Sequence, residues 1–313
     1  MSADPAFRIM RARVERVERV SPTFVRITFG GPELARFGTP GHVFDQRVKL
    51  VFPAPGRALP EFDAGDPDWY RAWLARPDDE RGSMRTYSIR ELIVDGDETR
   101  AVIDFVLHLA PGASGPASRW ASTAQLGDEL ILVGPQRGRF DGGGIEFSPG
   151  EARTLVLAGD ETAAPAIARI LEDADPASCG VAFIEVPDAA DALPIAAPPG
   201  VHVRWLPRGG TAHGTRLIPS MLEHLGAIGD AHAAAPVQLE DVDSEDLVWE
   251  TPVYSGLGEE LPKPVAHPDR YYWVAGESAV VTTLRRHLVK ELGIDRAQVA
   301  FMGYWRRGVA MRG

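Results

Sequence analysis

The pattern of hydrophobic residues changes near Gly150, and this change limits the possible folds more than any other feature of the sequence. Before it, short segments with alternating or β-branched residues are separated by Gly, Pro and Asp turns, at 13–31, 47–53, 85–94, 99–108 and 128–135. Short strands at such regular spacing predict a barrel or a sandwich. We expect an antiparallel β-barrel over residues 1–148.

After Gly150, apolar strands alternate with helices. Residues 153–173, "RTLVLAGDETAAPAIARILED", predict a buried strand, a glycine turn and a helix, and residues 271–293 repeat that order. Further strands are expected at 180–186, 201–207 and 296–305, and a helix at 214–225. Because such alternation produces parallel sheets, residues 149–313 are expected to form an α/β domain with a mainly parallel sheet.

One stretch of the second domain shows no period. Residues 229–264 are acidic and rich in Pro and Gly, which predicts a long surface loop. A single short element is expected in it, at residues 247–249.

Composition narrows the class of protein. A chain of 313 residues with 44% hydrophobic content can form two cores, and it has no run of eighteen apolar residues and no apolar signal-peptide core. We expect a soluble cytoplasmic protein without membrane insertion. The net charge of -11 argues against binding to nucleic acid, and the single cysteine excludes an internal disulfide framework. Nothing in the pattern demands an oligomer, so a monomer is expected.

The segment "SMRTYSIRELI", residues 83–93, places Arg85 and Tyr87 two apart on a predicted strand. Their side chains then point the same way, and a barrel followed by an α/β domain is the layout of flavin reductases. The guanidinium could pair with a phosphate while the phenol lies along a flavin ring, and Ser88 could bond the ring edge. An ordinary solvated edge strand would contain the same residue types, so this segment alone leaves both interpretations open.

A second candidate lies at residues 103–135, where an apolar strand and a Gly/Pro/Ser turn precede a helix expected to begin near Pro116. The first turn of a helix offers free N–H groups and a positive dipole end to a pyrophosphate. Pro116 and Ser118 suit that first turn. A capped surface helix is the alternative.

These segments, taken together, resemble one protein family. "RVKLVFP", "MRTYSIR", "DFVLHLAPGASGPASRWA", "GDELILVGP", "LAGDETAAPAI", "WVAGESAVVTTLRRHLVKELG" and "GYWRRG" occur in the order found in the siderophore-interacting proteins. These are FAD-containing ferric-siderophore reductases of the ferredoxin-reductase-like superfamily. The resemblance covers nearly the whole chain, and seven motifs in order are highly specific.

The resemblance implies an FAD-binding first domain, residues 1–148, and an NAD(P)H-binding second domain, residues 149–313. The implied cofactor-binding residues on the flavin side are Arg85, Tyr87, Ser88, Asp104, His108, Gly115, Ala117 and Ser118. Those near the adenosine half of FAD are Asp160 and Thr162. Those on the nicotinamide side are Gly276, Glu277, Tyr304, Trp305 and Arg306. The chain departs from the family pattern at Arg47, where the family usually has His, and at Leu109 and the longer turn after His108.

Other reaction classes lack their motifs. A G-x-G-x-x-G fingerprint and a G-x-S-x-G elbow are absent, and the histidines show no metal-ligand spacing. We therefore expect no metal site and no catalytic acid, base or nucleophile. The chemistry is expected to reside in the cofactor.

The function implied by the resemblance is electron transfer from NADH or NADPH through FAD to the iron(III) of a ferric siderophore. Reduction to iron(II) weakens the hold of the hard oxygen ligands, so the iron is released. Arg47 and Lys49 would share a strand face, and with Arg137 or Arg139 could form a basic pocket for an anionic chelate. Solvated surface charges are the alternative for these four residues.

Two other functions remain open from the sequence. One is a general NAD(P)H-flavin reductase that passes electrons to a ferredoxin or a diaphorase-type acceptor. The other is a module that binds a siderophore without redox turnover.

Overall fold

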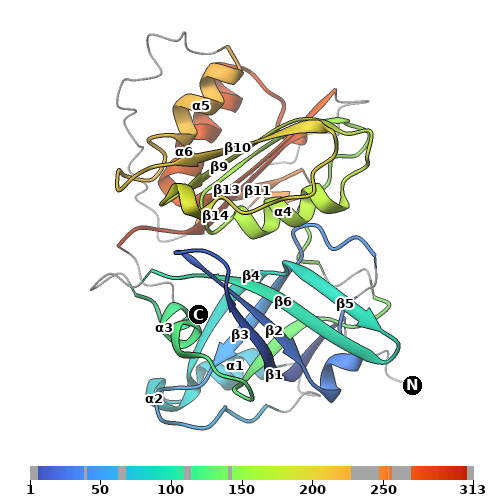
Figure 1. Ribbon diagram of the computed structural model, residues 1–313, viewed down its shortest axis with the longest axis vertical. Coiled ribbons are helices and arrows are strands. Elements are labelled where there is room, and N and C mark those ends of the chain that lie inside the picture. Colours follow the sequence, from blue (N-terminus) through green and yellow to red (C-terminus); the bar gives the residue numbers. More distant parts are fainter. Residues whose placement is uncertain are drawn as a thin grey trace. The chain divides into compact units, whose positions relative to one another are not determined.

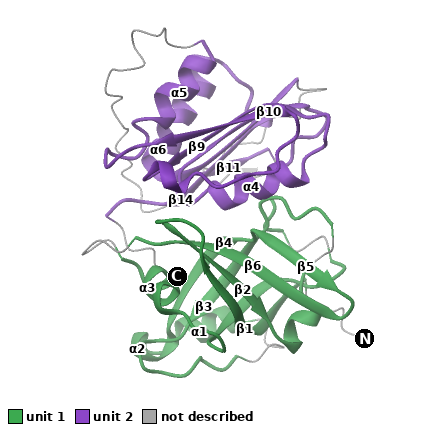
Figure 2. Ribbon diagram, viewed as in Figure 1, with its two compact units in different colours: residues 1–145, 312–313 green, residues 146–311 purple. Residues whose placement is uncertain are grey.

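The computed structural model describes residues 6–38, 41–62, 68–108, 114–139, 143–226, 247–252, 254–255 and 269–308. The chain divides into two compact units, of which the first ends at Ile145 and the second begins at Glu146 (Figure 2). The sequence predicts this boundary after residue 148.

Unit 1 is built on one antiparallel sheet with the strand order β4-β3-β7-β1-β2-β6-β5 (Figure 1). Its strands are β1 (Phe7–Arg19), β2 (Phe24–Gly30), β3 (Arg47–Phe52), β4 (Ser83–Ser88), β5 (Glu91–Asp95), β6 (Glu98–Val106) and β7 (Glu129–Pro135). Strands β4 and β5 stand at the two ends of this order and do not pair with each other. The curved sheet is therefore open between them, and it is a half-barrel. The predicted antiparallel barrel-type domain is confirmed.

The core of unit 1 follows from the alternation of residues along these strands. Ile27 and Phe29 of β2, Phe105 of β6 and Leu132 of β7 are fully buried in one cluster. The long strand β1 pairs with both β2 and β7, and its register with β2 shifts after Val14. Such a bulge bends a strand, which suits a curved sheet.

Short helices accompany this sheet: η1 (Pro32–Arg36), α1 (Trp69–Leu74), α2 (Asp78–Arg81) and α3 (Pro116–Thr123). The sequence predicts α3 but not α1 or α2. Trp73 of α1 is buried against Val51, Met84 and Ile131, on the sheet face away from the main core. Its indole Nε1 donates to the Arg81 carbonyl at 2.9 Å, which ties α1 to α2.

Unit 2 contains a mostly parallel sheet with the order β10-β9-β8-β13-β14-β11-β12. Its strands are β8 (Thr154–Gly159), β9 (Cys179–Val186), β10 (Gly200–Pro207), β11 (Trp249–Thr251), β12 (Tyr254–Ser255), β13 (Arg270–Glu277) and β14 (Val299–Trp305). The first five in the order run parallel; β11 pairs antiparallel with β14, and β12 pairs antiparallel with β11. The predicted α/β domain is confirmed. Strand β11 overlaps the short element expected at 247–249, and β12 also lies in the stretch predicted to be a loop.

Helices cover both faces of this sheet. Figure 1 shows α5 (Leu217–His224) and α6 (Ser278–Arg285) on one face and α4 (Ala164–Asp173) on the other. The first face contains a core of buried aliphatic and aromatic side chains that includes Phe183, Met221 and Leu284. The remaining elements are the short helices η2 (Ala189–Asp191) and η4 (Arg296–Gln298), and η3 (Arg286–Glu291), a π-helix that continues α6.

The parallel strands of unit 2 all end at one edge of the sheet, which we call the carboxyl edge. In open α/β sheets this edge is where ligands bind. The residues that follow β8 and β10, among them Asp160 and Arg208, lie at this edge. Within the described residues, no helix is long and apolar enough to cross a membrane.

Candidate functional site

Strand β4 presents Arg85 and Tyr87 on one face, as its alternation predicts. Tyr87 stands opposite Val48 and Arg85 opposite Leu50, so both lie on the face that carries the core of unit 1. The Tyr87 ring packs on Phe105 with its centroid 4.6 Å away. Burial raises the pKa of the Tyr87 phenol, although the charge of Arg85 opposes the shift. The phenol therefore stays neutral and acts as a flat, partly buried aromatic surface.

The Arg85 guanidinium is half-buried and has no carboxylate partner in the part of the chain that the structure describes. Its Nη1 donates to the Met84 carbonyl at 2.6 Å. Loss of hydration lowers the pKa of Arg85. A desolvated cation without a counterion is a strong anion ligand, because an entering phosphate restores the lost interaction.

Helix α3 lies beside the end of β6 and is fixed there by Ser118. The Ser118 Oγ accepts the His108 backbone N–H at 2.9 Å, so this side chain joins strand to helix and does not cap it. Gly115 is the N-cap residue, Pro116 the first helical residue, and Ala117 is buried. The four residues predicted in this segment, His108, Gly115, Ala117 and Ser118, thus lie at the junction of β6 and α3. The turn at 109–113 lies outside the described residues.

Asp104 occupies a different environment from the other predicted flavin-side residues. It is buried on β6, and both of its carboxylate oxygens accept hydrogen bonds from Arg26, at 2.7 and 2.8 Å. Arg90 approaches the same carboxylate at 3.9 Å. The carboxylate of Asp104 is therefore engaged in an ion pair that ties β2 to β6.

Arg47 and Lys49 share a face of β3, opposite Ser88 and Thr86 of β4, and this is not the face of Arg85. The Lys49 side chain is exposed and makes no hydrogen bond or ion pair within the described residues. Partial desolvation and the charge of Arg47 lower the pKa of Lys49. The two side chains form a small cationic patch on the outer face of the sheet.

Arg137 and Arg139, which are predicted to complete that patch, bond to other parts of unit 1. Arg137 Nη2 donates to Thr99 Oγ1 on β6, and its backbone N–H donates to the Arg36 carbonyl at 2.7 Å. Arg139 closes a turn by donating to the Gln136 carbonyl at 3.0 Å. In the part of the chain described, no hydrogen bond joins either arginine to the Lys49 side chain.

In unit 2, Asp160 connects three strands at the carboxyl edge. Its Oδ1 accepts from Thr162 N at 2.9 Å and from Thr162 Oγ1 at 2.5 Å. Its Oδ2 accepts from Glu277 N at 2.7 Å and from Trp305 Nε1 at 2.9 Å. Burial, with the neighbouring charge of Glu161, raises the pKa of Asp160 to about 6. Four donors therefore hold Asp160, which organises the ends of β8, β13 and β14.

Gly276 and Glu277 support this arrangement from β13. Gly276 has φ of +137°, and a Cβ there would lie 2.7 Å from Asp160 Cγ, so only glycine allows the close approach. Glu277 is the N-cap of α6. Its Oε2 accepts from Ala279 N at 2.8 Å and from Val280 N at 3.1 Å. The free N–H groups of this helix end are thus bound by the protein itself.

The predicted aromatic residues at the end of β14 lie at the same edge. The Trp305 ring meets the His213 ring edge-to-face, with centroids 4.8 Å apart. Tyr304 stacks on Trp249 of β11, with centroids 6.2 Å apart. Arg306 follows directly and is half-buried. Of these residues, Trp305 contacts Asp160 directly, and the joint assignment of the three to one site stays a prediction.

A buried ion pair next to Asp160 is not foreseen from the sequence. Arg208 donates to both oxygens of Glu161, at 2.6 and 2.7 Å, and the Glu161 side chain is 0% exposed. His213 Nε2 lies 3.1 Å from Glu161 Oε1. Burial alone would raise the pKa of Glu161, but the contacts with His213 and Arg208 outweigh it and lower the pKa to about 2. Burial lowers the pKa of His213, yet the Glu161 carboxylate raises it overall.

Glu185 at the end of β9 extends this polar cluster to α5. Its oxygens accept the backbone N–H groups of Gly214, Arg216 and Leu217 at 2.8 to 3.1 Å. The start of α5 is thereby held against the carboxyl edge. Within the described ranges, no group of three or more His, Cys, Asp or Glu side chains is placed to hold a metal ion.

Two family models match this chain. Residues 13–139 match the siderophore-interacting FAD-binding domain, and residues 152–308 match the model named siderophore-interacting protein. The chain belongs to the siderophore-interacting protein family. Its two-domain architecture is that of the ferredoxin-reductase-like proteins.

Relatives of this family member include two named reductases and a solved structure. Ferric vibriobactin reductase ViuB of Vibrio cholerae is 27% identical over 94% of this chain and 88% of its own length. The NADPH-dependent ferric-chelate reductase of Escherichia coli is 26% identical over 95% of this chain and 93% of its own. The crystal structure of a siderophore utilization protein from T. fusca superposes with a TM-score of 0.67 at 30% identity, covering 97% and 95% of the two chains.

Proposed function

We propose that this protein is an FAD-dependent reductase of ferric siderophores that uses NADH or NADPH and acts in the cytoplasm. The observation that carries the proposal is Arg85, a half-buried cation without a carboxylate partner among the described residues, on the strand face that also presents Tyr87. Both lie within residues 13–139, which match the FAD-binding domain.

The residues of unit 1 fit FAD by their chemistry. Arg85 supplies the charge for a phosphate, Tyr87 supplies an aromatic face for the ring system, and the start of α3 offers backbone N–H groups to a second phosphate oxygen. Ser118 holds that helix end against β6. When bound, FAD can accept an electron pair from a reduced nicotinamide and give electrons singly to iron(III).

Unit 2 supports the other half of the reaction. Its carboxyl edge is where α/β sheets bind nucleotides, and Trp305, Tyr304 and Arg306 gather there. The ion pairs and hydrogen bonds around Asp160 and Glu161 make this edge rigid, which suits the positioning of a nicotinamide ring.

The substrate is an anionic iron(III) chelate. Iron(III) is bound by hard oxygen ligands and is held less tightly after reduction, so electron transfer and iron release are one event. Arg47 and Lys49 are the cations that we assign to docking the chelate. Lys49 in particular has no ion pair among the described residues, so its charge remains available to a ligand.

The test uses the purified full chain and two variants of adjacent β4 residues. Arg85→Ala removes the proposed phosphate partner, while Thr86→Ala changes an exposed neighbour on the opposite face. A charge-assisted hydrogen bond contributes about 1.5 to 3 kcal/mol, so FAD affinity should fall about tenfold to a hundredfold in the first variant and stay unchanged in the second. Bound FAD is measured by absorbance after gel filtration.

Activity assays separate the three candidate functions. Anaerobic mixing with NADH and NADPH should bleach the flavin, and turnover should be faster with ferric siderophores than with dyes or a ferredoxin. Faster turnover with ferredoxin or dyes would favour the general reductase, and bleaching by neither nucleotide would favour the non-redox module. A protein that binds no FAD would refute the proposal.

A further inference from the structure

The sheet of unit 2 has a cavity at the edge opposite the carboxyl edge. Across β13, β8, β9 and β10, the register aligns Arg270, Thr154, Cys179 and Gly200 in one row at the strand starts. Helix α5 packs on this face but ends at His224. Beyond the end of α5 the described residues form a cavity of about 450 Å³, here called the amino-edge cavity, which is lined by Thr154, Cys179, Gly180, Val181, Gly200, His202, Arg204, His224 and Arg270.

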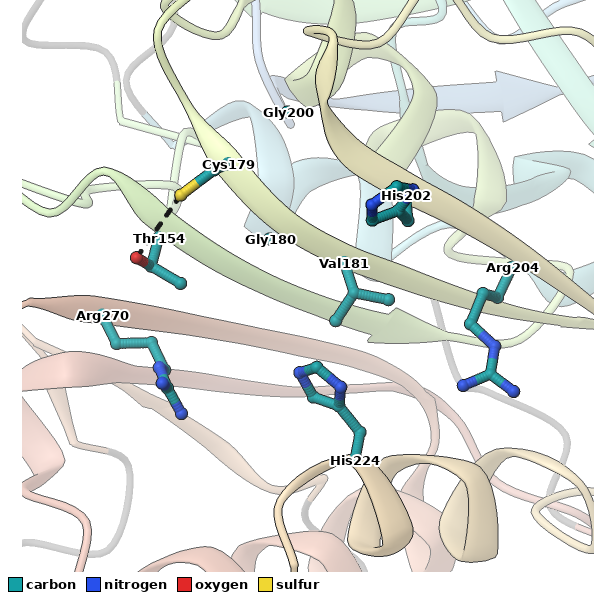
Figure 3. Close-up of a pocket in the computed structure, with 9 residues that line it drawn as sticks. All are labelled: Thr154, Cys179, Gly180, Val181, Gly200, His202, Arg204, His224 and Arg270. Atoms are coloured by element: carbon teal, nitrogen blue, oxygen red, sulfur yellow. Dashed lines mark hydrogen bonds between the residues drawn. The ribbon is translucent and has the colours of Figure 1, made fainter.

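The amino-edge cavity is basic. Four basic side chains, Arg204, Arg270, His202 and His224, surround Val181 in Figure 3, and none of the described lining residues is acidic. In the part of the chain described, Arg204 and Arg270 form no ion pair. A concentration of unbalanced positive charge is unexpected in a chain whose net charge is -11.

The basic groups are close enough to act on one another. Loss of hydration lowers the pKa of His224, and the charges of Arg270 and Arg204 lower it further. The three groups come from different elements, namely α5, β13 and β10. Arg204 is also held in place, since its guanidinium carbon lies 5.3 Å from the ring centroid of Phe183. An anion between these groups would replace their repulsion by attraction.

We propose that the amino-edge cavity is a binding site for a small phosphate-bearing anion. Guanidinium groups pair with phosphate oxygens through two parallel N–H donors, and imidazoles add further donors. The cavity volume exceeds what a bare phosphate fills and lies in the range of about 300 to 1,000 Å³ that is typical of small-molecule pockets. Val181 and Gly180 provide an apolar floor, which suits an organic phosphate with a flat apolar portion.

This site is separate from the carboxyl edge. Strand β8 runs from Thr154 at the cavity to Gly159 beside Asp160, a span of about 16 Å at roughly 3.3 Å per residue. A ligand in the amino-edge cavity would therefore not occupy the edge assigned to the nicotinamide nucleotide. The proposal does not depend on the reductase function and would stand if that function were wrong.

Titration calorimetry of the full chain at low ionic strength tests the proposal. The probes are inorganic phosphate, AMP and, as a carboxylate anion, citrate. Saturable binding of phosphate or AMP is expected, with citrate weaker by at least about tenfold. Tighter binding of AMP than of inorganic phosphate would identify an organic phosphate as the ligand class, and equal binding would identify the phosphate group alone.

Variants locate the binding. Arg204→Ala and Arg270→Ala should each weaken AMP binding about tenfold to a hundredfold. Arg16→Ala removes the same charge from an exposed ion pair of unit 1 and should bind as the parent does. Neither cavity variant should change reductase turnover. Should a variant fail to fold, the imidazole NMR signals of His224 and His202 in the parent still report binding, because phosphate must shift both.

Three results would overturn the proposal. They are the absence of saturable binding by both phosphates, affinities of Arg204→Ala and Arg270→Ala equal to that of the parent, and citrate binding as tight as that of AMP.

Discussion

Replacing Arg208 by methionine should lower the free energy of unfolding of unit 2 by about 3 to 5 kcal/mol, because it leaves a buried carboxylate without its main partner. Glu161 is 0% exposed and receives two hydrogen bonds from Arg208, at 2.6 and 2.7 Å. In Arg208→Met the carboxylate keeps its contact with His213, at 3.1 Å. We therefore expect a value toward the lower end of this range.

A second substitution separates the ion pair from simple loss of packing. Glu161→Gln with Arg208→Met removes both charges while keeping side chains of similar size. The double variant should be more stable than the sum of the two single effects predicts, by at least about 2 kcal/mol. The matched control is Arg16→Met, which breaks an exposed pair with Glu18 and should change stability by less than about 1 kcal/mol.

The assay is urea unfolding followed by far-UV circular dichroism and tryptophan fluorescence. Because the two units can unfold separately, the curves are fitted with one transition for each, and only the transition of unit 2 should move. If Arg208→Met unfolds within about 1 kcal/mol of the parent, the pair contributes little, and the reasoning from burial is refuted.

Three further predictions concern other parts of the molecule. Lys49→Glu should raise the KM for an anionic ferric siderophore, more at low than at high salt, with little change for a neutral dye acceptor; equal KM values at low salt would remove Lys49 from the docking site. Gly276→Ala should destabilise unit 2 by about 1 to 3 kcal/mol from backbone strain alone, and the clash of the new Cβ, 2.7 Å from Asp160, should add to this. A melting temperature within 1 °C of that of the parent, which corresponds to roughly 0.3 kcal/mol, would contradict the prediction. Glu161, with a folded pKa of about 2 against an ordinary 4.5, should contribute about 3 kcal/mol above pH 4.5 and lose it as the pH falls toward 2, so the stability difference between parent and Glu161→Gln should shrink over that window in acid unfolding curves.

The features predicted from the sequence are those set by local patterns. Strand alternation alone places Arg85 and Tyr87 on one face, and the apolar strand, glycine turn and helix order correctly yields β8 with α4 and β13 with α6. Helices α1 and α2 were missed because each is too short to show a helical period. A four-residue segment such as Asp78–Arg81 cannot be distinguished from a charged turn.

The contacts of the site depend on residues far apart in the chain. Asp160 bonds to Glu277 N, 117 residues away, and to Trp305 Nε1, 145 residues away. No local pattern shows that its two oxygens are engaged by the protein. Arg208 likewise meets Glu161 across 47 residues, and the only hint in the sequence was an acidic pair directly after an apolar strand. The sequence does not indicate the partners of Asp104 and Arg137, because an isolated charged residue can equally bind a ligand, form an ion pair or face solvent.

The position of β8 in its sheet has a consequence for the synthesis of the chain. Its neighbours are β9, which follows soon after, and β13, which ends at Glu277, 117 residues beyond Asp160. At a synthesis rate of about 5 to 20 residues per second, β13 is completed on the order of ten seconds after β8. During that interval the apolar segment "TLVLAG" has an unpaired backbone edge, which is the kind of surface that other chains can join. All strands of unit 1 are complete once β7 is made, before β8, so we expect unit 2 to be the part of the nascent protein that needs chaperones.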